Sequence, residues 1–183
     1  MTGPFQLDIT RKEFSFRCAR CGNVHRGSPS FAYAKPPSYF DVPEAERGRR
    51  IFLTSDICAI DDRIFYIRGL LEIPIHGARD PFAWGVWVTQ SEESFRRYLE
   101  TYDRDQSGMG SFGWLGVDLP TYRRTGKGEN IEFLKCNVSW GPAGRRPLVE
   151  LQDSDHPLCA DQRHGISWER TIEIAQAAMH PQP

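Results

Sequence analysis

The segment spanning residues 50–88 alternates apolar and polar residues, and this alternation constrains the fold more than any other feature of the sequence. A period of two residues is typical of a β-strand with one buried face. Asp61 and Asp62 interrupt the pattern as a turn, and Pro74 and Gly77 end it, so residues 50–75 predict a long β-hairpin. A further strand follows, with Trp87 on the face opposite its main apolar set, so we expect both faces of this sheet to be covered. The apolar set of the two strands comprises Phe65, Ile67, Leu71, Ile73, Ile75, Phe82, Trp84, Val86 and Val88.

The rest of the chain predicts helices and shorter strands. Ser91 precedes two glutamates and an apolar stripe with helical spacing, which is typical of a capped helix. Pro157 predicts the start of a second helix that Gly165 closes, and Ser167 predicts the cap of a third. The glycine-rich segment 107–116 is interpreted as a flexible loop. Two more strands are predicted at residues 134–140 and 147–151.

These elements predict an α+β fold in a single domain covering residues 1–183. Its mainly antiparallel sheet would carry two or three packed helices. Residues 13–60 would hold a small N-terminal zinc-ribbon-like knuckle and a proline-rich loop, and residues 61–183 the sheet and the helices.

Composition excludes several classes of protein. The 23 basic and 24 acidic residues leave a net charge of -1, so we expect no general binding of nucleic acid or of an anionic membrane. No apolar run approaches the roughly 20 residues of a membrane span, and residues 1–5 lack the order of a signal peptide. The odd number of cysteines, five, argues against a secreted disulfide framework. We therefore expect a cytoplasmic protein with reduced thiols.

The turn Cys18-Ala19-Arg20-Cys21-Gly22 has the spacing of a zinc knuckle, because two thiolates two residues apart can face one ion. His25 follows closely enough to be a third ligand, and Cys58 is the best remaining thiol, whereas Cys136 has a core pattern. These four residues, Cys18, Cys21, His25 and Cys58, form the predicted structural zinc site. Two alternatives stay open for the cysteine pair: reduced surface thiols, or a redox couple. A catalytic zinc becomes the interpretation only if Cys58 is not a ligand.

A possible ligand pocket is predicted from Arg68, Glu72, Trp87 and His156. Arg68 and Glu72 lie on the less apolar face of the second hairpin strand, where an arginine either anchors an anion or forms a structural ion pair. Asp155 beside His156 suits proton transfer, but it also suits a helix cap followed by a surface histidine. Phosphate-loop, nucleophile-elbow and zinc-protease motifs are missing from the sequence.

Several short motifs together resemble the bacterial family called domain of unknown function 2199. They are Cys18-x-x-Cys21-Gly22-x-x-His25, Ser55-Asp56-Ile57-Cys58, Arg68-Gly69, Glu72-Ile73-Pro74, Trp84-Gly85-Val86-Trp87 and Asp155-His156-Pro157-Leu158. The resemblance covers residues 16–179 and implies no particular activity. It does imply that the Cys, Cys, His and the later Asp-x-Cys occur together, which supports Cys58 as a companion of the knuckle.

Two functional hypotheses follow. The first is a binding or interaction module with a structural zinc, in which exposed aromatics of the proline-rich loop and Trp87 meet an unknown protein or a small-molecule ligand. The second is a small metal-assisted or acid-base enzyme with a pocket around Arg68, Glu72 and His156, also using Asp56. Catalytic residues stay unassigned.

Overall fold

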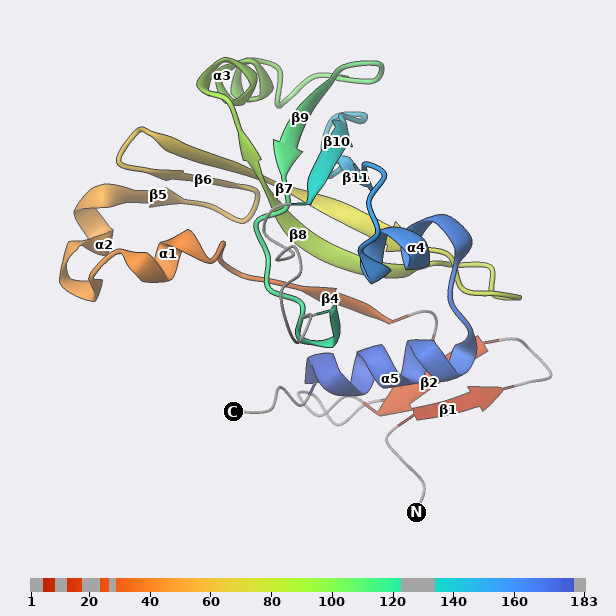
Figure 1. The fold of residues 1–183 in the computed structure, drawn as a ribbon. Helices are drawn as coiled ribbons and strands as arrows, with labels where there is room; N and C mark the ends of the chain where they lie inside the picture. The colour runs from red at the N-terminus through yellow and green to blue at the C-terminus, as the bar shows by residue number, and fades with distance from the viewer. Residues whose placement is uncertain (1–4, 9–12, 18–23, 27–28, 123–133, 180–183) are drawn as a thin grey trace.

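The computed structural model describes residues 5–8, 13–17, 24–26, 29–122 and 134–179 (Figure 1). Its strands form two sheets. A small antiparallel sheet has the order β1-β2-β3, with β1 at Phe5–Asp8, β2 at Glu13–Arg17 and β3 at Val24–Arg26. The larger sheet contains β4 (Ser30–Ala32), β5 (Ile51–Leu53), β6 (Ile57–Ile60), β7 (Ile64–Ile73), β8 (Phe82–Gln90), β9 (Gly110–Trp114), β10 (Lys135–Ser139) and β11 (Leu148–Leu151).

The antiparallel pair β7 and β8 forms the centre of the larger sheet and confirms the predicted alternation. Leu71 faces Trp84 and Ile67 faces Val88, and all four side chains are buried in the main core. The turn between β6 and β7 places Asp61 and Asp62 at φ values of 52° and 50°, a left-handed conformation that aspartate tolerates better than most residues. The predicted hairpin therefore exists, with β5 paired to the outer edge of β6.

The larger sheet curls so that its β9 end returns to β8. From β8 the strand order runs β7-β11-β10-β9, and Leu115, just after β9, bridges back to Val88. The segment predicted as a flexible glycine-rich loop is thus a strand, and that prediction was wrong. Gly113 explains the pattern, because a Cβ atom there would lie 2.1 Å from the carbonyl oxygen of Thr89. Glycine is needed for the close approach of two strands rather than for flexibility.

Two strand pairs are parallel, β4 with β8 and β11 with β7, so the sheet is mixed although most of its pairs are antiparallel. Five helices accompany the sheets in the described residues. They are α1 (Ser38–Asp41), α2 (Glu44–Arg50), α3 (Glu92–Glu100), α4 (Pro157–His164) and α5 (Trp168–Met179), with a short 3-10 turn, η1, at Pro120–Tyr122. The structure is therefore a mixed α and β fold with a core made mostly of sheet.

The predicted helix ends agree with the structure. The Ser91 hydroxyl accepts a hydrogen bond from the Ser94 amide at the start of α3, at 3.1 Å. Pro157 opens α4, and Gly165 ends it with a φ of 78°. The Arg170 amide donates to the Ser167 hydroxyl before the first turn of α5, at 3.2 Å. Within the part of the chain that the structure covers, no helix is long and apolar enough to cross a membrane.

A second, smaller apolar cluster lies on the outer face of the larger sheet, where α1 and the segments around it cover part of β6, β7 and β8. Its buried members are Val42, Cys58, Ile60, Tyr66 and Trp87. The Trp87 indole N–H donates to the carbonyl oxygen of Tyr33 at 3.0 Å. Trp87 is consequently buried, which agrees with the expectation that both faces of this sheet are covered, and it cannot belong to the exposed partner surface of the first functional hypothesis.

Candidate functional site

The outer face of the sheet carries the same short pattern twice, on neighbouring strands. Arg68-x-Leu70-x-Glu72 lies on β7, and Arg146-x-Leu148-x-Glu150 leads into β11 and continues along it. Leu70 and Leu148 are direct partners in the parallel pair. Side chains two residues apart share a face, so two arginines lie at one end of this face, two leucines at its centre and two glutamates at the other end.

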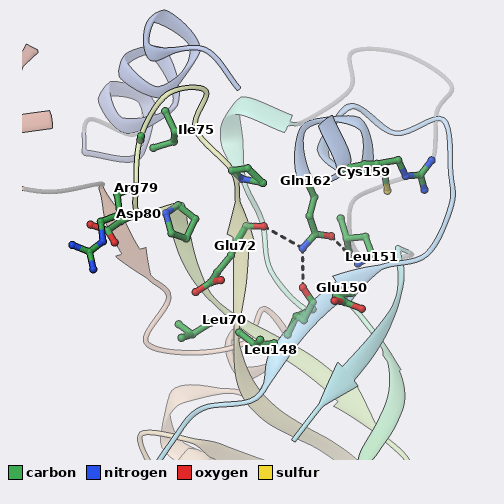
Figure 2. A pocket seen from close by; sticks show the side chains of 15 residues that line it. Leu70, Glu72, Ile75, Arg79, Asp80, Leu148, Glu150, Leu151, Cys159 and Gln162 are labelled. Carbon is green, nitrogen blue, oxygen red and sulfur yellow. Dashed lines mark hydrogen bonds between the residues drawn. The ribbon is translucent and has the colours of Figure 1, made fainter. Parts of the chain in front are cut away.

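A hollow of about 560 Å³ lies over the glutamate end (Figure 2). Glu72 and Glu150 line it, together with the two leucines, and its volume falls in the range of small-molecule sites. The segment that follows β7 contributes further lining residues, and α4 contributes Cys159, Gln162 and Arg163. The lining residues of that segment are Pro74, Ile75, Ala78, Arg79, Asp80 and Pro81.

The Gln162 side chain joins the two strands under this hollow (Figure 2). Its Nε2 donates to the carbonyl oxygens of Val149 at 2.8 Å and Glu72 at 3.4 Å, and its Oε1 accepts from the Leu151 amide at 2.8 Å. Past Leu70 and Leu148, this amide takes the place of the direct ladder bonds between β7 and β11. The floor of the hollow is therefore held by one polar side chain from α4.

A smaller hollow of about 260 Å³ lies toward the arginine end, and Leu70 lines both hollows. Arg146 and Asp56 both line it and form an ion pair, with Arg146 Nε 2.7 Å from Asp56 Oδ1. Arg145 also lines it, and the Tyr102 hydroxyl donates to Asp56 Oδ2 at 3.2 Å. The remaining lining residues are Tyr98, Gln106 and Gly144.

Arg68 lies close to Asp56 and Arg146 of this smaller hollow, and only some of its hydrogen-bond donors have acceptors among the described residues. Its Nη1 donates to the carbonyl oxygen of Ser55 at 3.1 Å, and its Cζ lies 5.6 Å from the centre of the Trp87 ring. Its Nε is buried and has no hydrogen-bond partner among the described residues. Burial and the charge of Arg146 lower the pKa of the Arg68 guanidinium, and Asp56 offsets this in part. Positive charge is therefore in excess at this end of the face.

The structure separates the residues of the predicted pocket. Glu72 lines the larger hollow, whereas Arg68, on the same strand face, is not among the lining residues of either hollow. His156 is fully buried at the N-cap of α4, where its Nδ1 accepts a hydrogen bond from the Leu158 amide at 3.2 Å. It is neither a surface histidine nor one of the lining residues of the two hollows. The side chains of Arg68, Glu72 and His156 therefore do not meet in one acid-base site.

Sequence reasoning missed Arg146, Glu150 and Gln162. The signal that could have identified the first two is the repeated Arg-x-Leu-x-Glu spacing. Gln162 carries no such signal, because its role depends on how α4 docks against β7 and β11.

Two of the four predicted zinc ligands lie outside the described residues, and His25 belongs to β3. Cys18 and Cys21 belong to the undescribed segment 18–23, although the pairing of Arg17 with Val24 shows that the segment connects two paired strands. Cys58 is fully buried on β6 in the second apolar cluster, and burial raises the pKa of its thiol to about 11. In the described ranges no group of three or more His, Cys, Asp or Glu side chains could hold a metal ion.

Comparison with models of known protein families gives a match over most of the chain. The model of a family described as an uncharacterized protein conserved in bacteria matches residues 17–166. That span includes every residue that lines the two hollows. No curated protein and no solved structure matches the chain.

Proposed function

The chain belongs to the bacterial family called domain of unknown function 2199, and we propose that it is a binding module that takes an anionic group of a small ligand at the arginine end of its outer sheet face. The observation that supports this most is the excess of guanidinium groups around the smaller hollow. Arg68, Arg145 and Arg146 gather there with Asp56 as the carboxylate among them.

Like charges on neighbouring strands destabilise a sheet unless something compensates them. The carboxylate of Asp56 is already engaged by Arg146 and Tyr102. An anion with two or more oxygens would add the missing charge, and Arg145 and Arg146, which line the hollow, would donate to it, because arginine forks suit carboxylate and phosphate groups best.

The test is a titration of isotope-labelled protein with sodium acetate and with inorganic phosphate, followed by NMR of the arginine Nε–H groups and of the Leu70 amide. We expect the signals of Arg145 and Arg146, which line the hollow, to shift and saturate. Arg145→Gln should weaken binding by about twofold to fivefold, since an exposed charge contributes up to roughly 1 kcal/mol. This variant keeps the Asp56–Arg146 ion pair intact.

Arg49→Gln is the matched control, because the Arg49 side chain is 79% exposed on α2, away from the residues that line either hollow. It should bind both anions as the unmodified chain does. Unchanged arginine signals at high anion concentration, or equal weakening by both variants, would contradict the proposal.

A structural zinc in the N-terminal ribbon completes the proposed module. Cys18, Cys21 and His25 would hold it, with Cys58 as the fourth ligand. The support is the spacing of the cysteines and the strands β2 and β3, which bracket the turn that contains them. In this arrangement the metal stabilises the fold and leaves ligand binding to the outer sheet face.

A further inference from the structure

We infer that the two hollows form one extended site for a short peptide with free termini. Its carboxylate would lie in the smaller hollow by Arg145 and Arg146, and its amino terminus would lie between Glu72 and Glu150. This inference rests on the proposed anion site and adds the class of ligand.

The charge distribution along the face supports an orientation of this kind. In the larger hollow, Glu72 and Glu150 give two carboxylates, and the guanidiniums of Arg79 and Arg163 also line it. Arg163 also forms an ion pair with Asp153, which is outside the hollow. Negative charge is therefore in excess at the glutamate end, while positive charge is in excess at the arginine end. A ligand with one charge of each sign would compensate both.

The centre of the face is apolar and open. Leu70 lines both hollows, and Leu148 beside it has 45% of its surface exposed. The two leucines would contact the middle of the ligand, where burial of apolar side chains stabilises the complex. An apolar or small central residue in the peptide is therefore expected.

The spacing of the charges sets the length of the ligand. Arg68 and Glu72 are four residues apart on one strand, which corresponds to about 13 Å along the sheet. An extended chain covers about 3.4 Å per residue, so the termini of a tripeptide are roughly 10 Å apart. With side chains reaching inward from each end, a tripeptide can contact both. The charges of a single free amino acid are too close together to do so.

The experiment is isothermal titration calorimetry with four forms of the peptide Ala-Leu-Ala: unmodified, N-acetylated, C-amidated, and blocked at both ends. We expect the unmodified peptide to bind most tightly and each single block to weaken binding by about tenfold, which corresponds to roughly 1.4 kcal/mol. The double variant Glu72→Gln, Glu150→Gln should bind the unmodified and the acetylated peptide equally. Glu93→Gln, on the exposed surface of α3, should keep the difference.

The outcomes separate this inference from the proposed function. Equal affinity for all four peptide forms overturns the inference, and so does a double variant that still distinguishes the acetylated peptide. Binding of acetate or phosphate without binding of the peptide also overturns it, but leaves the proposed anion site standing. Failure of both anions and peptides removes the proposed function as well. Circular dichroism of each variant verifies that the comparison is made on folded protein.

Discussion

Single residues show how the buried polar groups of this protein find partners. The Tyr122 hydroxyl donates to Asp161 Oδ2 at 2.8 Å, and Arg170 Nε lies 3.5 Å from the same oxygen. The Arg170 guanidinium also lies over the Tyr122 ring, with Cζ 5.3 Å from its centre. One residue from η1, one from α4 and one from α5 thus meet in a small network that joins the C-terminal helices to the segment after β9.

We predict that Tyr122→Phe lowers the free energy of unfolding by about 1–2 kcal/mol, because it leaves a partly buried carboxylate with one hydrogen bond fewer. Burial and the neighbouring Asp161 raise the pKa of the Tyr122 phenol, so its proton is present at any ordinary pH. The loss should accordingly be the same at pH 6 and pH 9 in urea denaturation. Tyr39→Phe is the control, since the Tyr39 hydroxyl makes no hydrogen bond to the described residues. An equal loss in both variants would contradict the assigned role of the network.

At the scale of elements, the contact between β7 and β11 depends on the Gln162 amide. Its Nε2 faces two carbonyl oxygens and its Oε1 faces an amide, so the orientation of the side chain matters. We predict that Gln162→Glu costs about 2–3 kcal/mol of stability, because a carboxylate oxygen replaces the donor opposite both carbonyls. Gln162→Ala should cost less, since it removes donor and acceptor together and admits water.

Hydrogen exchange provides the local measurement for Gln162. The Leu151 amide should exchange faster in both variants, while amides of the β7–β8 pair keep their protection. Gln152→Ala is a suitable control, because the Gln152 side chain bonds only to exposed Asn137 among the described side chains. Protection at Leu151 that stays unchanged in Gln162→Glu would show that the ladder does not need the amide.

The same scale shows what the sequence could predict. The β6–β7–β8 meander follows from local signals, namely a period of two residues and the Asp61-Asp62 turn. The parallel pairing of β11 with β7 joins segments about 80 residues apart, and alternation does not specify which strands become neighbours. The sequence therefore predicted only part of the site. Arg68 and Glu72 share a predicted strand face, but Arg146 and Glu150 lie beside them only because β11 pairs with β7 in the folded protein.

A further error has the same origin. The glycines of 110–116 resemble a flexible loop locally, yet they permit the close return of β9 to β8. A contact between distant segments outweighed the local pattern there. Trp87 agrees with the expectation that both sheet faces are covered, because the segment around Tyr33 and Val42 covers it with a second apolar cluster, and it therefore cannot form part of an exposed partner surface.

At the scale of the whole molecule, the small sheet β1-β2-β3 needs a source of stability beyond its own strand pairs. Its strands are only three to five residues long, and its pairings are separate from those of the larger sheet. A sheet of this size needs a packed apolar face or another constraint. The predicted zinc, bound by Cys18, Cys21, His25 and Cys58, would supply one, and Cys58 would tie the ribbon to β6.

We predict one equivalent of zinc in the purified protein, measured by elemental analysis, and loss of that zinc with a lower melting temperature in Cys58→Ser. Without metal, burial keeps the pKa of the Cys58 thiol near 11, so zinc must displace a proton that the apolar cluster otherwise retains. Metal binding should therefore weaken steeply as the pH falls, because protons compete with zinc for the thiolate sulfurs. Cys136→Ser is the control: its thiol is equally buried, in the main core, so it should lose stability but keep its zinc. Zinc retained by Cys58→Ser would remove Cys58 from the ligand set and make its role one of packing. Purified protein without zinc would refute the site altogether.

Chelation of the zinc followed by hydrogen exchange locates the effect of the metal, since amides of β2 and β3 should lose protection while those of β7 and β8 keep theirs.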